Sequence, residues 1–157
     1  MVFNMEEHGE WQPPEWWYTD SRPMSDDCYF ENMSRVIFQA GLNWRVIDTK
    51  WPRIKEAFED FKISKVAQFT GADVQRLLRD EGIIRHKGKI QAVIYNAQGF
   101  EAIHKQFGSF QKYLDSQDKS DNYRRVVDDL IGKFKWLGKP SATTYLYTVG
   151  EKINVWE

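Results

Sequence analysis

The chain has 157 residues, a net charge of −1 and a pI near 6.3, with 41% hydrophobic and 29% charged residues. This balance suits one globular domain and excludes a protein that is basic over its whole surface. The single cysteine, Cys28, excludes an intrachain disulfide and a zinc cluster built on thiolates. No apolar run could cross a bilayer and no secretory signal is recognised at the acidic start, so we expect a cytoplasmic protein.

Residues 1–24 show no helical period and contain prolines and several aromatic residues. We expect them to form an ordered aromatic arm, followed by a single helical domain over residues 25–157. Trp16, Trp17 and Tyr18 would either line a pocket that stacks on flat rings or pack on the core for stability alone. The sequence leaves both interpretations open.

From Ser25 onward the apolar residues repeat at helical spacing. Ser25 suits an N-cap, and Gly41 is placed to end this first helix. Short helices are then predicted over 44–50, over 52–58 with Pro52 in the first turn, and over 64–69. The next helix begins at Thr70 or Gly71 and breaks at Gly82.

A long helix is predicted to open near Lys89, because apolar residues follow at helical spacing as far as Phe100. Further helices are expected over 109–114, 123–134 and 141–149, separated by polar or glycine-containing segments. No strand pattern and no internal repeat is apparent. The sequence therefore predicts an all-α, compact multi-helix domain.

The turn between two of these helices is the most informative local feature. It carries two bracketing glycines, three cations and a histidine: Gly82, Arg85, His86, Lys87, Gly88 and Lys89. Backbone N–H groups at the start of the second helix would suit a DNA phosphate, and the cations would add salt-dependent attraction. Charge runs at turns are common, however, so composition alone favours a plain solvated loop.

Three segments closely resemble those of the DNA-3-methyladenine glycosylase I family, in that family's order. Residues 82–94 (GIIRHKGKIQAVI) resemble its helix-hairpin-helix region, residues 39–44 (QAGLNW) resemble its QAGLSW segment, and residues 134–138 (FKWLG) resemble its FKFVG segment. The resemblance extends over roughly residues 26–150.

This resemblance implies an all-α fold of the helix-hairpin-helix DNA glycosylase type and a monomer that acts without a cofactor. It implies hydrolysis of the N-glycosidic bond of an alkylated purine in double-stranded DNA, after the damaged base has left the stack. By the same resemblance, Trp44 would stack on the base, although a core tryptophan is the alternative. Gln39 and Asn43 would make polar contacts at the pocket rim.

The chain departs from the family pattern at two places. Val36 occupies the position of the family's base-contacting glutamate, and Glu31 lies more than a helical turn earlier. The family's zinc site is not matched either, since the start of the chain supplies only His8 and Cys28, so no metal is expected.

Three functions therefore remain open. The first is a DNA glycosylase that acts on a modified purine. The second, motivated by Val36, is a non-catalytic protein with the same fold that binds damaged DNA. The third is a helical protein whose hairpin is only structural and which has no DNA partner.

Overall fold

The computed structural model describes residues 13–155, and within this range all regular structure is helical. In chain order the elements are α1 (Asp26–Gln39), α2 (Trp44–Ala57), the 3₁₀ helix η1 (Glu59–Phe61), α3 (Ile63–Val66), α4 (Gly71–Leu78), α5 (Lys87–Phe107), α6 (Phe110–Asp115), α7 (Ser120–Lys133) and α8 (Lys139–Thr148). The prediction of an all-α domain is confirmed.

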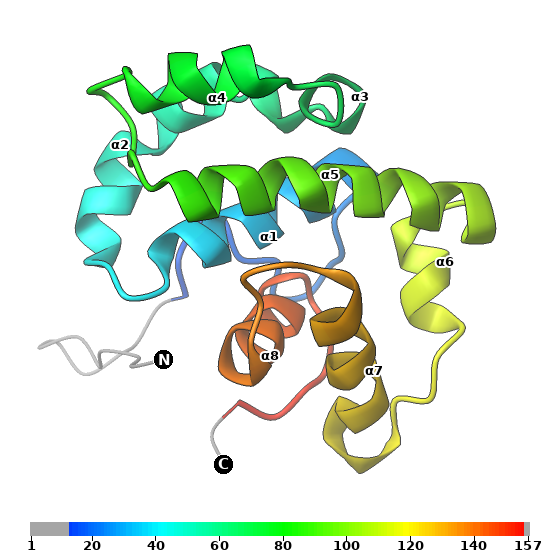
Figure 1. Ribbon diagram of the computed structural model, residues 1–157. Coiled ribbons are helices and arrows are strands. Elements are labelled where there is room, and N and C mark those ends of the chain that lie inside the picture. Colours follow the sequence, from blue (N-terminus) through cyan, green and yellow to red (C-terminus); the bar gives the residue numbers. More distant parts are fainter. Residues whose placement is uncertain (1–12, 156–157) are drawn as a thin grey trace, which may run out of the picture.

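The longest helix, α5, runs through the middle of the molecule beside α1 (Figure 1). Helices α2 to α4 lie on one side of this central pair, and α7 and α8 lie on the other side. The predicted inner face of α5 is buried as expected, since Ile90, Val93, Ala97 and Phe100 are each fully enclosed. The loop between α1 and α2 and the loop between α4 and α5 lie at the same end of the molecule (Figure 1).

Several helix boundaries follow from their caps. The Ser25 hydroxyl accepts a hydrogen bond from the backbone N–H of Cys28, which begins α1 as predicted. Thr70 and Asp73 form a capping box that begins α4. The His86 ring accepts a bond from the N–H of Lys89 at 3.1 Å, so α5 begins at Lys87, two residues before the predicted start.

The predicted break before Pro52 is wrong, because residues 44–57 form the single helix α2 with Pro52 in its interior. Proline removes one hydrogen bond from a helix. Trp51 and Ile54, on either side of it, are both buried in the core, and this packing holds the helix together across the proline.

The described part of the N-terminal arm packs against α8. Trp17 is buried with its ring edge-on to Tyr147, and the N–H of Tyr18 donates to the carbonyl of Thr148 at 2.8 Å. Beyond α8, Gly150 has a φ of +85°, and a side chain there would collide with the carbonyl oxygen of Ser21. Glycine is thus needed where the N-terminal arm meets the segment that follows α8.

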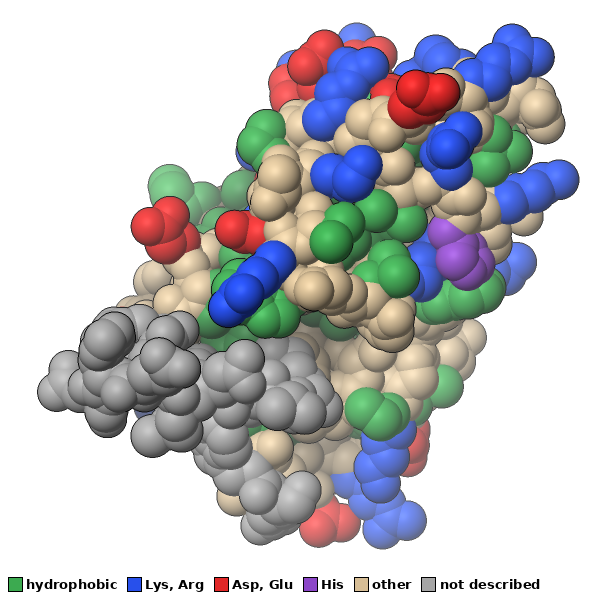
Figure 2. All heavy atoms as spheres, turned by 90° about the vertical axis from the view of Figure 1, so that its left-hand side faces the viewer, with side chains coloured by type: hydrophobic (Ala, Val, Ile, Leu, Met, Phe, Trp, Pro, Cys, Tyr) green, Lys and Arg blue, Asp and Glu red, His purple; other side chains and the backbone are tan. Residues whose placement is uncertain are grey.

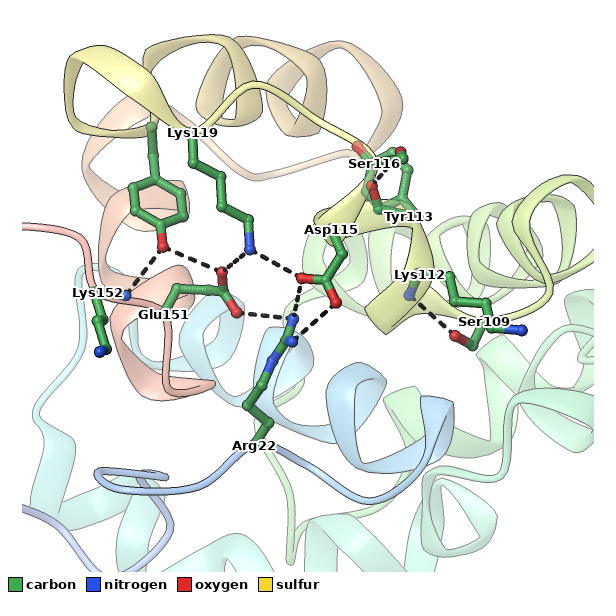
Figure 3. Close-up of polar contacts among 10 residues, drawn as sticks. Arg22, Ser109, Lys112, Tyr113, Asp115, Ser116, Lys119, Glu151 and Lys152 are labelled. Carbon is green, nitrogen blue, oxygen red and sulfur yellow. Dashed lines mark hydrogen bonds and ion pairs between the residues drawn. The ribbon is translucent and has the colours of Figure 1, made fainter.

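An ion-pair network joins the same two segments (Figure 3). The Glu151 carboxylate is almost fully buried and lies 3.0 Å from Arg22 and 2.8 Å from Lys119. Both cations also contact Asp115, which lies at the end of α6. The network therefore connects the arm, the α6–α7 connection and the segment after α8. None of the helices in the described range is long and apolar enough to span a membrane.

Candidate nucleic-acid interface

The α4–α5 turn presents three predicted contact residues to solvent. Arg85, His86 and Lys87 are all exposed, and they lie immediately before or within the first turn of α5. The face of the molecule that includes this end carries many Lys and Arg side chains with hydrophobic ones between them (Figure 2). Such a surface offers a polyanion both charge attraction and apolar contact.

Lys89 does not face solvent, so the prediction that its side chain contacts a phosphate is wrong. Its exposed fraction is 4%, and its ammonium donates to the carbonyls of Ala40 at 2.6 Å and Phe38 at 3.3 Å. These carbonyls belong to the end of α1, where backbone acceptors lack helical partners. Burial lowers the pKa of the Lys89 ammonium. Lys89 thus fastens the start of α5 to the segment that precedes Gly41.

Four residues after Ala40, Trp44 begins α2. Its indole is 49% exposed, which rules out the alternative of a core tryptophan. The guanidinium of Arg45 lies 5.4 Å from the ring centroid. The side chain of Asn43 accepts a hydrogen bond from the N–H of Arg45 at 2.9 Å, so Asn43 caps α2. Gln39, the last residue of α1, is partly buried.

A buried arginine lies close to this segment, and its contacts were not predicted from the sequence. Arg35 forms an ion pair of 2.7 Å with Asp48, one helical turn after Trp44. The Arg35 guanidinium also lies 4.7 Å from the ring centroid of Trp16 and 5.0 Å from that of Trp51. Burial lowers the pKa of Arg35, although Asp48 opposes this shift. This pair has no local signal in the sequence, because its members lie on different helices.

Three aromatic residues of the arm were predicted to line a pocket. Of these, only Trp16 has its ring next to the Arg35 guanidinium. Trp17 is instead 6% exposed and packs on Tyr147 of α8, so its ring is enclosed by protein rather than open to a ligand. Tyr18 forms an isolated β-bridge with Val149. The Trp17 and Tyr18 positions correspond to the alternative interpretation, in which the arm packs for stability.

The nearby carboxylates are already paired. Val36 is buried in the core, and the Glu31 carboxylate accepts a hydrogen bond from the Trp51 indole at 3.0 Å and pairs with Lys55 at 3.2 Å. Both carboxylate oxygens of Glu31 are therefore engaged by other side chains. In the described residues no cluster of three or more His, Cys, Asp or Glu side chains is suited to a metal ion, and His8 lies outside them.

An exposed tryptophan and a glycine-framed, cationic hairpin at the same end of a helical domain are features typical of DNA-binding proteins. The family model for methyladenine glycosylases matches residues 11–130, and the chain belongs to that family.

The chain is 30% identical over 121 residues to a DNA-3-methyladenine glycosylase of Haemophilus influenzae, an alignment that covers 77% of this chain and 60% of the relative. It is 41% identical over 91 residues to DNA-3-methyladenine glycosylase 1 of Escherichia coli, covering 58% of this chain and 44% of the relative. The matches thus span less than two thirds of these relatives' lengths.

The fold is similar to solved structures of 3-methyladenine DNA glycosylase I. The enzyme from Staphylococcus aureus has a TM-score of 0.73 and 28% sequence identity, covering 86% of this chain and 82% of that one. A variant of 3-methyladenine DNA glycosylase I in complex with 3-methyladenine gives a TM-score of 0.74 at 28% identity, covering 85% and 81%.

Proposed function

We propose that this protein excises an alkylated purine, of the 3-methyladenine kind, from double-stranded DNA by hydrolysing the N-glycosidic bond. One observation carries the proposal: the Lys89 ammonium joins the hairpin to the segment that leads into Trp44. This contact links the exposed turn, which would bind phosphate, to the segment that carries the exposed indole. Family membership and the likeness to 3-methyladenine glycosylases support the same activity.

In this proposal the hairpin and the indole have separate tasks. Arg85, His86 and Lys87 would hold the phosphates of one strand, which positions the duplex without reading its sequence. Trp44 would stack on the base once it has left the helix, and Gln39 and Asn43 would border the pocket. A cationic methylated adenine is already a good leaving group. Water would attack the sugar carbon, and the protein would need no cofactor and would act as a monomer.

The paired state of the local carboxylates supports a second candidate, a non-catalytic protein that binds damaged DNA. Val36 supplies no charge, while Glu31 and Asp48 are both engaged with cations. Positive charge that develops on the base or sugar would then meet no free carboxylate at position 36. This candidate shares its fold, its partner and its surface with the first.

Release of free 3-methyladenine from methylated duplex DNA distinguishes the two candidates. The glycosylase proposal predicts release above the rate of the protein-free control. The alternative predicts salt-dependent binding to damaged duplex without release, and a gain of release in Val36→Glu. Absence of both release and binding would contradict both candidates and favour a protein without a DNA partner.

A further inference from the structure

An exposed indole lies against the first turn of α5, in the loop between α7 and α8. Trp136 is 48% exposed, and its ring lies 5.0 Å from that of His86 in an edge-on arrangement. A Cβ at Gly88 would approach the Trp136 ring to 2.7 Å. The indole thus rests on the backbone of Gly88, next to the hairpin residues that face solvent.

The loop that carries this indole is held rigidly. The side chain of Asn96, 1% exposed, donates to the carbonyl of Lys135 at 3.1 Å and accepts from the N–H of Lys135 at 2.8 Å. Phe134 is buried, and its ring would lie 3.0 Å from a Cβ at Gly99. These contacts anchor the residues before Trp136 to α5 at two neighbouring positions.

The loop also holds its tryptophan in an unfavourable conformation. Trp136 has a φ of +62°, in the left-handed region that residues with a Cβ seldom adopt. Such backbone strain persists only where the surroundings enforce it, and it often accompanies function. Here a strained, anchored loop leaves about half of a large apolar side chain in water, and that exposed half gains nothing from burial.

Other exposed apolar side chains lie on the neighbouring segment. Leu42, Trp44 and Val46 are each more than 40% exposed, and this segment is joined to α5 through Lys89. Exposed apolar groups therefore lie next to the hairpin at Trp136 and on the segment that follows the Lys89 contact. Lys135 adds a further exposed ammonium, 4.1 Å from the ring centroid of Tyr95.

We propose that Trp136 is a second aromatic contact to DNA, packing its exposed face against a deoxyribose and base of the strand whose phosphates lie on the hairpin. This inference rests on the proposed DNA-binding function. The mixture of exposed indole and ammonium groups fits a nucleic-acid strand, in which apolar sugar and base faces alternate with phosphates. Lys135 binds an adjoining phosphate.

Binding of the full chain to a labelled duplex with an abasic-site analogue, measured at several salt concentrations, tests this assignment. Trp136→Ala is expected to weaken binding at least about fivefold without changing the salt dependence, because an apolar contact releases no counterions. Lys135→Gln is expected to lower the slope of log affinity against log salt by about 1. Ile131→Ala, which alters an exposed apolar side chain on α7, serves as the matched control and is expected to bind as the unaltered protein does.

Trp136→Phe, which keeps a ring at this position, should retain part of the affinity and excludes a mere folding effect. Thermal melting of each variant checks that the fold persists. If the unaltered protein binds and Trp136→Ala binds within about twofold of it, the inference is overturned while the proposed function stands. If the unaltered protein neither binds duplex DNA nor releases base, the proposed function fails and the inference falls with it.

Discussion

At the scale of single residues, Lys87 and Lys89 both lie in the first turn of α5, but their side chains have different surroundings. Lys87 is exposed at the start of α5, whereas Lys89 is buried with its ammonium on two backbone carbonyls. Ammonium groups rarely lie in a protein interior without partners of this kind. We infer that Lys89 positions the segment before Trp44 and does not itself touch DNA.

Lys89→Met tests this role, since methionine keeps a chain of similar length without the charge. We expect the free energy of unfolding to fall by about 1–3 kcal/mol, because two carbonyls at the end of α1 lose a hydrogen-bond donor. Duplex binding should also weaken, because the segment before Trp44 is released. Chemical denaturation and binding at fixed salt measure the two effects.

The matched control is Lys87→Met, two residues earlier. This change should leave stability unaltered within about 0.5 kcal/mol, as usual for exposed positions. If Lys87 contacts a phosphate, the slope of log affinity for DNA against log salt concentration should decrease by about 1 in this variant. Equal loss of stability in both variants would contradict the distinction drawn between the two lysines.

At the scale of elements, the positions of the helices were easier to predict from the sequence than the contact partners of their polar side chains. Ser25 and the apolar face from Ile90 to Phe100 indicated α1 and α5 directly, because caps and periodicity are local properties. The predicted helix break before Pro52 was wrong, because tertiary packing of α2 outweighs the tendency of proline to interrupt a helix.

The candidate site was predictable only in part. Trp44 and the exposed turn residues followed from motifs, but the contact of Lys89 with α1 and the pairing of Arg35 with Asp48 depend on how separate helices meet. In sequence, Lys89 looks like any other cation in a basic turn. Side-chain partners distant along the chain carry no local signal, and these were the features missed.

The α7–α8 loop approaches α5 closely at Gly88. Gly88→Ala would place a methyl group against the Trp136 ring, which we expect to offset the usual gain of about 1 kcal/mol from alanine in a helix. Overpacking of this kind typically costs about 1–3 kcal/mol. The variant should therefore be no more stable than the unaltered protein, as measured by chemical denaturation.

Gly132→Ala is the matched comparison, because a Cβ at Gly132 on α7 would meet nothing within 4 Å. This variant should be stabilised by roughly 0.5–1 kcal/mol through the lower helix propensity of glycine. An equal gain from both substitutions would show that Trp136 does not rest on Gly88.

At the scale of the whole molecule, an ion-pair network joins segments near the two ends of the described chain. Arg22 and Lys119 each bridge the carboxylates of Glu151 and Asp115 (Figure 3). Because Glu151 is nearly inaccessible to water, loss of either cation would leave a buried charge with one partner fewer. The network thereby couples the packing of the arm to the segment after α8.

This network should contribute to stability in a pH-dependent manner. Hydrogen bonds from Arg22 and Lys119 hold the pKa of Asp115 below its usual value of 3.8. The resulting stabilisation is complete above that value and disappears as the pH falls through the lower pKa of the folded state. Asp115→Asn should therefore be less stable than the unaltered protein at pH 7, with the difference narrowing as the pH falls below about 4.

Thermal unfolding at pH 7 and at pH 3 measures this difference. Asp128→Asn, which removes an exposed carboxylate on α7, is the control and should have little effect at either pH. A stability difference for Asp115→Asn that stays constant between the two pH values would contradict the assigned pairing.

We propose that the segment around Trp44 and the α4–α5 hairpin form one surface that contacts DNA. NMR can test this surface by following indole and backbone N–H signals while a duplex with an abasic-site analogue is added. We expect the Trp44 indole signal and the amides of Arg85 and Lys87 to shift together, whereas the buried Trp17 signal stays in place. A Trp44 signal that remains unmoved while the hairpin amides shift would contradict it.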